Sequence, residues 1–469
     1  MSVLSSLEPQ EVFSFFQILS DIPRGSTNEK EAAEWVVKFA QERGLEAEKD
    51  DLHCVLVRKP GQLGLENAAP LVLHGHLDMV CEKDEGVVHD FEKDPIRLVI
   101  DGNYITADGT SLGADNGIGV SYILALLDST DIPHPPLEAV LTAMEEKGKA
   151  GAAEFDTSRL KGRRMIDFNW ITDNEILAGC SGDITFVVDV PAEWEPVPAE
   201  LTETRILRVR GLNGGHCEFD IQLERANALQ VLTRVLTAVS NEFDVRISSP
   251  FGGAQNNAIP MDAEAVLSIR PEDVKGVADI IAEIGAQLSN EYRTADAGVR
   301  LELAEAAAPE RVFSAAASAR LASIISLIPN GVISWSLIVP GIVETSNNIG
   351  TIRPTEDGVR IASTITSAVT SRKHDVLNRV RALVALAGGG VTVEEYGLDA
   401  PEFPYRPDSP LLAVAVQAYR DLNNSEPDVH VSQCSLELGM FSQKVPGLDT
   451  ISIGTELHDL HSPRESVSY

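Results

Sequence analysis

Short apolar runs alternate with helix-like segments in the first third of the chain. The runs cover residues 54–58, 70–77 and 137–144, each bounded by glycine, proline or charged residues. The segment SLGADNGIGVSYILALL, residues 111–127, joins a glycine-rich turn to an apolar helix that begins near residue 116. Residues 27–43 have the apolar stripe of an amphipathic helix. Strands that alternate with helices predict an α/β sheet with helices on its faces.

The segment VPAEWEPVPAEL, residues 190–201, interrupts this pattern with closely spaced prolines. Strand-like and helix-like segments then resume and continue to about residue 392. The chain has 469 residues, whereas a single core rarely serves more than about 250–300. We therefore expect a first domain over residues 1–190, a second over 191–392, and a return to the first over 393–469.

Composition narrows the environment and the partners. The formal net charge of −33 repels phosphate backbones, so nucleic acid is not expected as a partner. No apolar run approaches the roughly 20 residues of a membrane span, and the start, MSVLSSLEPQEV, has no basic leader. The five cysteines are scattered and form no CxxC pair, as is typical of reduced thiols. These features predict a cytoplasmic protein.

Acidic and histidine residues gather at the ends of several predicted strands and turns. They lie in HGHLD (74–78), GADNG (113–117), MEEKG (144–148), GGH (214–216) and DLHSP (459–463). Taken singly, each has an ordinary interpretation as a satisfied histidine, a solvated glutamate pair or a turn. Together they supply what a two-metal hydrolase needs. Each ion takes a histidine and carboxylates, one carboxylate bridges the pair, and another stays free as a base.

The order of these motifs resembles a known family. HGHLDMV, TSLGADNGIG, MEEKG, GCSG, GLNGGH, NNAIP, GIVETS and HSP follow one another as in the co-catalytic zinc peptidases that carry a lid domain. The most similar branch is aminoacyl-histidine dipeptidase, or peptidase D, which cleaves Xaa-His dipeptides such as carnosine. The resemblance runs from about residue 5 to the end of the sequence. It implies an α/β catalytic domain, with a mixed central sheet flanked by helices, and an inserted α+β lid domain at 191–392.

The resemblance also implies the metal ligands. They are His76, Asp115, Glu146 and His461. Asp115 matches the carboxylate that bridges two divalent ions, and the peptide bond that follows it is expected to be cis. Zinc is the expected ion, and manganese or cobalt can replace it because histidine and carboxylate ligands accept several metals. His74 has no role in the family and is expected to be structural.

Catalytic roles follow from the same resemblance. Glu145 matches the general base, which takes a proton from a metal-activated water and returns it to the leaving amine. Asp78 matches the aspartate that orients the His76 ring. His216, in the lid, matches the residue that stabilises the oxyanion. The matches for substrate binding are Asn257, Ser346 and Asn348.

One expected ligand of the His76 metal departs from the family pattern. The family has an acidic residue where an ungapped count back from Gly179 places Asn169. A neutral amide oxygen is a poorer zinc ligand than a carboxylate, so the first metal site is expected to be weak or empty unless another acid replaces it. Two acidic residues are candidates to replace Asn169 as the ligand: Asp167, on the same strand face, and Asp173, in the following loop.

Two positions in the lid also depart from the pattern. Cys217 and Glu218 follow the GGH motif where the family has Ser-Gly, which places an anion beside the histidine meant to meet an oxyanion. Thr366 occupies the place of an arginine that grips the substrate carboxylate. Arg360 and Arg372 are the candidates to replace it, although a displaced arginine would not reproduce the same bidentate contact.

Three functions remain open at this point. The first is a cytosolic metallodipeptidase that hydrolyses small peptides, with Xaa-His dipeptides as the leading substrates and a homodimer as a compatible assembly. The second is a catalytically impaired, peptidase-like binding protein with a defective first metal site at Asn169. The third is a related amidohydrolase that acts on N-acyl amino acids. Metal content and metal-dependent hydrolysis distinguish the first function from the second.

Overall fold

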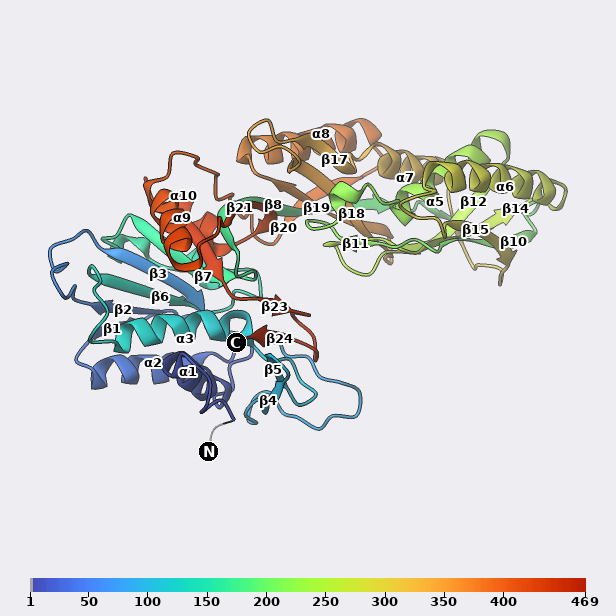
Figure 1. The fold of residues 1–469 in the computed structure, drawn as a ribbon. Coiled ribbons are helices and arrows are strands. Elements are labelled where there is room, and N and C mark those ends of the chain that lie inside the picture. The colour runs from blue at the N-terminus through green and yellow to red at the C-terminus, as the bar shows by residue number, and fades with distance from the viewer. Residues whose placement is uncertain (1–2) are drawn as a thin grey trace. The chain divides into compact units, whose positions relative to one another are not determined.

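The computed structural model describes residues 3–469, and their contacts divide the chain into two compact units (Figure 1). Unit 1 contains the residues up to Cys180 together with Glu402–Ser432 and Leu436–Tyr469. Unit 2 contains Ser181–Pro401 and Gln433–Ser435. Strand β8 (Glu175–Pro191) runs through the first crossing without a break.

Unit 1 is built on a mixed sheet in the strand order β1-β2-β6-β3-β7-β22. These strands are β1 (Glu46–Lys49), β2 (Val55–Lys59), β6 (Leu137–Thr142), β3 (Leu71–His76), β7 (Arg164–Trp170) and β22 (Asp449–Gly454). Strand β3 pairs in parallel with both β6 and β7, and β7 pairs in parallel with β22. Strands β1 and β2 add an antiparallel edge. The expected mixed central sheet is therefore confirmed.

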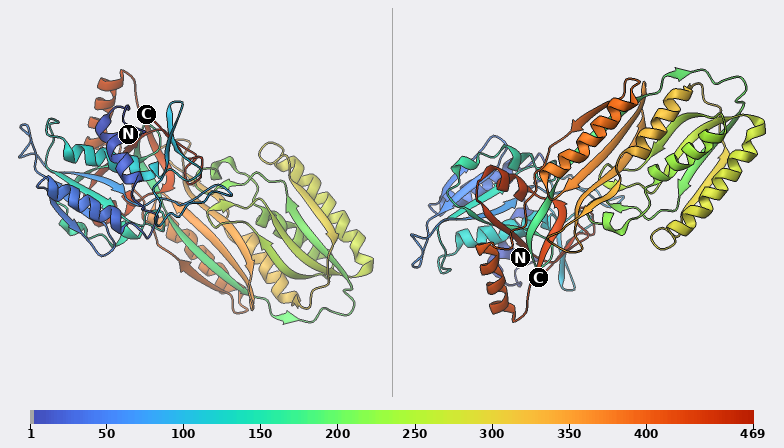
Figure 2. Two further views of the ribbon diagram at one scale, coloured as in Figure 1. Left: turned by 90° about the horizontal axis from the view of Figure 1, so that it is seen from below. Right: turned by 90° about the horizontal axis from the view of Figure 1, so that it is seen from above.

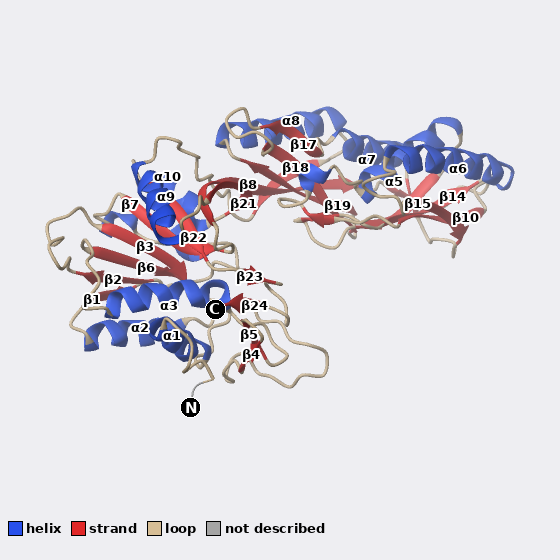
Figure 3. Cartoon of the chain, viewed as in Figure 1, coloured by secondary structure: helices blue, strands red, loops and turns tan. Residues whose placement is uncertain are grey.

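Helices cover both faces of this sheet (Figures 1 and 3). They are α1 (Gln10–Ser20), α2 (Lys30–Glu42) and α3 (Ala114–Asp128) on one face, and α9 (Pro410–Asn423) and α10 (Glu437–Lys444) on the other. Side chains such as Val36, Leu73 and Ile123 form one buried cluster between the first three helices and the strands. Burial of this apolar surface is the main force that holds the helices on the sheet.

A small second sheet in unit 1 contains the last strands of the chain. Its order is β23-β24-β5-β4. The strands are β4 (Leu98–Asp101), β5 (Tyr104–Ala107), β23 (Leu457–His458) and β24 (Ser466–Ser468). Because β24 pairs with both β5 and β23, residues 459–465 form a loop tied at both ends.

Unit 2 is an antiparallel sheet in the order β8-β19-β18-β12-β14-β10-β15, with helices on one face (Figures 1 and 2). The strands after β8 are β19 (Gly358–Ser367), β18 (Val343–Pro354), β12 (Arg246–Gly252), β14 (Ala263–Ile269), β10 (Glu203–Arg210) and β15 (Arg300–Glu305). The helices are α5 (Ala228–Glu242), α6 (Val274–Glu291), α7 (Ala315–Leu327) and α8 (Thr370–Ala387). This arrangement is the α+β fold expected of the second domain.

Shorter elements complete the chain. They are α4 (Ala150–Glu154), β9 (Trp194–Glu195), β11 (Gly215–His216), β13 (Ala258–Ile259), β16 (Val312–Phe313), β17 (Gly331–Trp335), β20 (Thr392–Tyr396) and β21 (Asp428–Ser435). Three short 3-10 turns lie at Thr157–Arg159, Ile221–Leu223 and Pro271–Asp273. No helix within residues 3–469 has both the length and the apolar composition needed to span a membrane.

Candidate metal centre

The candidate centre forms where the parallel strands of unit 1 end. His76 is the last residue of β3, and Met144–Glu146 follow β6, the parallel neighbour of β3. On the other side, His74 of β3 pairs with Asp167 of β7, so His76 and Asn169 follow two residues later on adjacent strands. The carboxyl ends of parallel strands are the usual place for a site in such sheets, because the chain leaves them in loops.

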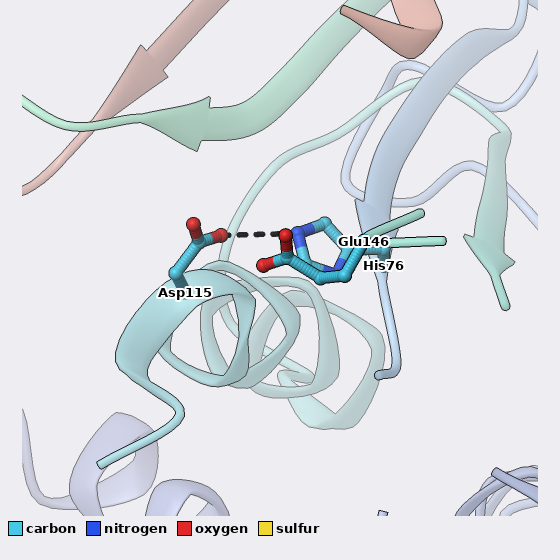
Figure 4. Close-up of side chains that lie close together, drawn as sticks. All are labelled: His76, Asp115 and Glu146. Atoms are coloured by element: carbon cyan, nitrogen blue, oxygen red, sulfur yellow. Dashed lines mark hydrogen bonds and ion pairs between the residues drawn. The ribbon is translucent and has the colours of Figure 1, made fainter. Parts of the chain in front are cut away.

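Two histidines face the two oxygens of one aspartate. The Nε2 atom of His76 lies 3.0 Å from Oδ1 of Asp115 (Figure 4). The Nε2 atom of His461 lies 3.4 Å from Oδ2 of Asp115 and 3.0 Å from Oε1 of Glu146. The ligand atoms of His76, Asp115 and Glu146 all lie within 4.8 Å of one another. This donor set could hold a divalent metal ion, because imidazole nitrogens and carboxylate oxygens are the ligands that such ions prefer.

Asp78 holds the His76 ring and both glutamates in place. Its carboxylate lies 3.4 Å from Nδ1 of His76, accepts the backbone N–H groups of Glu145 and Glu146, and accepts the hydroxyl of Ser26. Burial alone would raise the pKa of Asp78, but the contacts with His76 and Ser26 hold this pKa below its ordinary value. A carboxylate in this position fixes the orientation of a metal-binding imidazole.

Asn116 joins the two strands that carry His76 and Asn169. Its side-chain oxygen accepts the backbone N–H of His76 at 3.2 Å, and its amide nitrogen donates to the carbonyl of Phe168 at 2.7 Å. The peptide bond between Asp115 and Asn116 is cis, as the resemblance implied. No pattern in the sequence indicates that Asn116 connects these two strands.

The pKa values of two histidines and one glutamate in the centre are raised. Burial lowers the pKa of His76, but hydrogen bonds to Asp115 and Asp78 outweigh this effect and raise it well above its ordinary value. Hydrogen bonds to Asp115 and Glu146 raise the pKa of His461 to about 10. Burial raises the pKa of Glu145 to about 8. The imidazoles and the buried carboxyl thus retain protons that a bound cation would displace.

Asp167 is not available to replace the missing acidic ligand. It is 1% exposed, and its oxygens accept from Nδ1 of His74 at 2.7 Å and from the hydroxyl of Ser452 at 2.5 Å. The prediction that Asp167 replaces the missing acidic ligand is therefore wrong, because both of its oxygens accept hydrogen bonds within a buried network. Asp173 is exposed in the turn after β7 and belongs to no metal-ligand group found among residues 3–469.

His74 has the structural role that was expected of it. Its Nδ1 atom contacts Asp167, and its Nε2 atom lies 3.3 Å from Glu437 at the start of α10. Thr142 also donates to Glu437, at 2.6 Å. All of these side chains are buried, so the network ties β3, β6 and β7 to α10 behind the metal ligands.

The predicted lid residues all lie in unit 2. His216 ends β11, and its Nδ1 atom accepts the N–H of Glu218 at 3.2 Å, so a neutral ring carries its proton on Nε2. Asn348 is 1% exposed and donates to the carbonyls of Asn256 and Ala258. It thereby fixes the short segment that carries Asn257.

The other positions singled out in unit 2 lie in its sheet or, for Arg372, in helix α8. Ser346 and Thr366 are paired with each other across β18 and β19, and each is 3% exposed. The two candidate arginines already have partners, because Arg360 forms a two-point contact with Asp189 and Arg372 pairs with Glu344 at 2.6 Å.

Comparison with known proteins identifies the family and the fold of the chain. The model of peptidase family M20/M25/M40 matches residues 72–469. The cytosol non-specific dipeptidase of Escherichia coli (strain K12) is 36% identical over 470 aligned residues, which cover 100% of this chain and 96% of that protein. The crystal structure of aminoacylhistidine dipeptidase from Vibrio alginolyticus superposes with a TM-score of 0.89 at 33% identity, covering 100% of this chain and 94% of that one.

A more distant structure shares the fold alone. Aminopeptidase PepT from Bacillus cereus gives a TM-score of 0.55 at 14% identity, over 98% of this chain and 93% of that one. The family match over most of the sequence and the full-length relative together establish the classification. The chain belongs to peptidase family M20/M25/M40 and is a metallopeptidase of that family.

Proposed function

We propose that the protein is a cytosolic dipeptidase that hydrolyses small peptides, with Xaa-His dipeptides of the carnosine type as leading substrates. The observation that carries the proposal is the convergence of His76 and His461 on the two oxygens of Asp115, with Glu146 in contact with His461. The names of the Escherichia coli and Vibrio alginolyticus relatives support the dipeptide substrate, and the first also supports the cytosolic location. In this proposal unit 1 is the catalytic domain and unit 2 is the lid.

The residues of the chain divide the chemistry between them. His76, Asp115, Glu146 and His461 would hold two divalent ions, with zinc first and manganese or cobalt as alternatives. When bound, such ions lower the pKa of a shared water and polarise the scissile carbonyl. Glu145 acts as the general base: it would accept a proton from the water and return it to the leaving amine. Burial raises its pKa in the metal-free protein, and the charge of bound cations would favour the carboxylate form that a base requires.

Two further residues complete the proposed mechanism. Asp78 keeps the His76 ring in the orientation that points Nε2 at Asp115. His216, with Nδ1 occupied as an acceptor, would present Nε2–H to the oxyanion of the tetrahedral state. Asn257 and Ser346 are proposed to contact the peptide, and Asn348 to support Asn257.

One observation favours a second candidate function, a peptidase-like binding protein with impaired catalysis. Asn169 stands at the end of β7 beside the His76 strand, and Asp167 is engaged elsewhere. The His76 side of the centre then has one fewer carboxylate than the His461 side. A cation held there by His76 and Asp115 alone would bind weakly.

The test combines metal content with hydrolysis. Protein purified without chelator is analysed by mass spectrometry for bound metal, and carnosine hydrolysis is measured with and without added zinc or manganese. About two ions per chain with metal-stimulated turnover support the dipeptidase. Absence of turnover under every metal, with one ion or none, rejects it in favour of the binding protein. Hydrolysis of N-acetyl amino acids but not of dipeptides would instead support the amidohydrolase.

A further inference from the structure

A buried arginine lies beside two of the segments that carry the proposed ligands. Arg24 follows α1 and is 2% exposed. Its guanidinium donates to the carbonyls of Leu77 at 3.0 Å and Asp78 at 3.3 Å, just after His76. It also donates to the carbonyl of Gly113 at 2.5 Å, two residues before Asp115. One side chain therefore joins the end of the β3 strand to the turn that begins α3.

A buried glutamate holds the same turn from another segment. Glu465 is 3% exposed and precedes β24. One of its oxygens accepts the backbone N–H groups of Leu112 at 2.9 Å and Gly113 at 3.0 Å, and the other accepts that of Asp115 at 3.2 Å. Glu465 lies in the loop that presents His461, so it connects that loop to Asp115.

The two side chains contact opposite polar groups of one peptide turn. The carbonyl of Gly113 faces Arg24, whereas its N–H faces Glu465. Glycine is needed for this approach, because Gly113 has a φ of 70° and a Cβ there would come within 2.7 Å of Nη2 of Arg24. A Cβ on Gly117 would come within 2.5 Å of the same atom. The turn is therefore packed directly against the guanidinium.

The charges of the two groups balance each other across the turn. Burial lowers the pKa of Arg24, and the charges of Glu465 and Asp78 oppose that effect. Burial likewise raises the pKa of Glu465. A single buried charge is costly unless it is compensated, so removal of either partner leaves the other in an unfavourable environment.

We propose that Arg24 and Glu465 are positioning residues that set the placement of Asp115 relative to His76 and His461. Neither side chain is a proposed metal ligand or substrate contact. They act through the backbone of residues 77–78 and 112–115, which fixes the separation of the ligands before a cation binds. This inference rests on the proposed function, because it assumes that the four residues form a metal centre.

The test uses substitutions that remove charge or preserve it. Arg24→Met and Glu465→Gln remove one charge each, the double variant removes both, and Arg24→Lys keeps the positive charge. Lys444→Met is a matched control, because Lys444 also donates to several backbone carbonyls in unit 1, those of Ala152, Ala153 and Phe155. Two measurements are made on each protein. Hydrogen exchange of residues 108–118 is followed in the metal-free state, and zinc affinity is measured by competition with a chelator.

The single charge-removing variants should exchange the amides of residues 112–115 at least about tenfold faster than the parent and bind zinc about 10- to 100-fold more weakly. Arg24→Lys should recover part of both losses, and the double variant should lose less than the product of the single effects. In hydrolysis, kcat should fall while KM changes little, because neither residue touches the substrate. Lys444→Met should change thermal stability but neither the exchange of this turn nor zinc affinity.

Other outcomes separate the inference from the proposed function. Unchanged exchange and unchanged zinc affinity in folded Glu465→Gln would overturn the positioning role, as would equal losses in Arg24→Lys and Arg24→Met. If the parent protein does not bind zinc, the proposed function fails, and the exchange measurement still decides whether the two charges hold the turn. If Arg24→Met does not fold, the comparison of Glu465→Gln with Arg24→Lys carries the same test.

Discussion

Replacement of Asn169 by aspartate should strengthen metal binding on the His76 side of the centre. Asn169 is half-buried near the end of β7, two residues beyond the register pair of His74 and Asp167. The substitution is nearly isosteric and exchanges a neutral amide oxygen for a carboxylate. We expect Asn169→Asp to raise the zinc content toward two ions per chain, with the gain confined to the weaker of the two sites.

The size of the effect follows from the charges at the site. At an effective dielectric constant of about 20, a unit charge roughly 4 Å from a divalent ion contributes about 8 kcal/mol of attraction. Desolvation of the carboxylate and the ion as they pair reduces this gain to roughly 2–3 kcal/mol. This corresponds to an affinity about 30- to 150-fold higher. Without metal, the extra carboxylate should lower the melting temperature, because Asp115, Glu145 and Glu146 are already close together.

The assay is zinc titration against a chelator, with thermal unfolding in the presence and absence of zinc. Asn169→Ala is the control for loss of the amide without added charge and should bind zinc no more tightly than the parent. Asp173→Asn should have no effect, because Asp173 is exposed in a turn. The reasoning is refuted if Asn169→Asp leaves zinc affinity and stoichiometry unchanged, since Asn169 would then not face the first ion.

Three further predictions concern the same centre. Glu145→Gln should reduce turnover by about 10²- to 10⁴-fold and leave the metal content unchanged. Kinetics and mass spectrometry on one sample measure both quantities, and a parallel loss of metal would contradict the role of Glu145 as base. Asp78→Asn should weaken zinc binding about 10- to 100-fold, because Asp78 holds His76 and the N–H groups of Glu145 and Glu146; equal affinity in a chelator competition would disprove this. The metal-free protein should lose stability as pH rises from about 5 to 9. Burial raises the pKa of Glu145 from 4.5 to about 8, and the carboxylate partners of His461 raise its pKa from 6.5 to about 10. The folded chain then binds more protons than the unfolded chain across this range, so a calorimetric melting temperature that increased with pH would contradict it.

Local patterns in the sequence were sufficient to predict many elements. The amphipathic stripe at 27–43 corresponds to α2, and the apolar runs at 54–58, 70–77 and 137–144 correspond to β2, β3 and β6. The glycine-rich turn leads into α3 as expected. These predictions succeed because the periodicity of apolar residues is set by which face of an element is buried.

Placement of the site required more than local pattern. HGHLD forms the end of β3, and MEEKG follows β6, its parallel neighbour. Their proximity is therefore a consequence of strand order, which depends on contacts between residues far apart in sequence. The ligand roles of Asp115 and His461 follow only from the family resemblance. No local pattern predicts Arg24 and Glu465, because they contact backbone carbonyl and N–H groups of distant segments.

The register of β3 and β7 explains why the centre is asymmetric. Asp167 pairs with His74 across the two strands, and Asn169 and His76 each follow two residues later, on the same strand faces. Asp167 is held in a buried network with His74 and Ser452, and the position two residues further along β7 carries a neutral amide. The other half of the centre has His461, Glu146 and Asp115 together. Under the proposed function, a cation would therefore bind first on the His461 side, and the occupancy of the His76 side would distinguish a peptide-hydrolysing protein from one that only binds peptides.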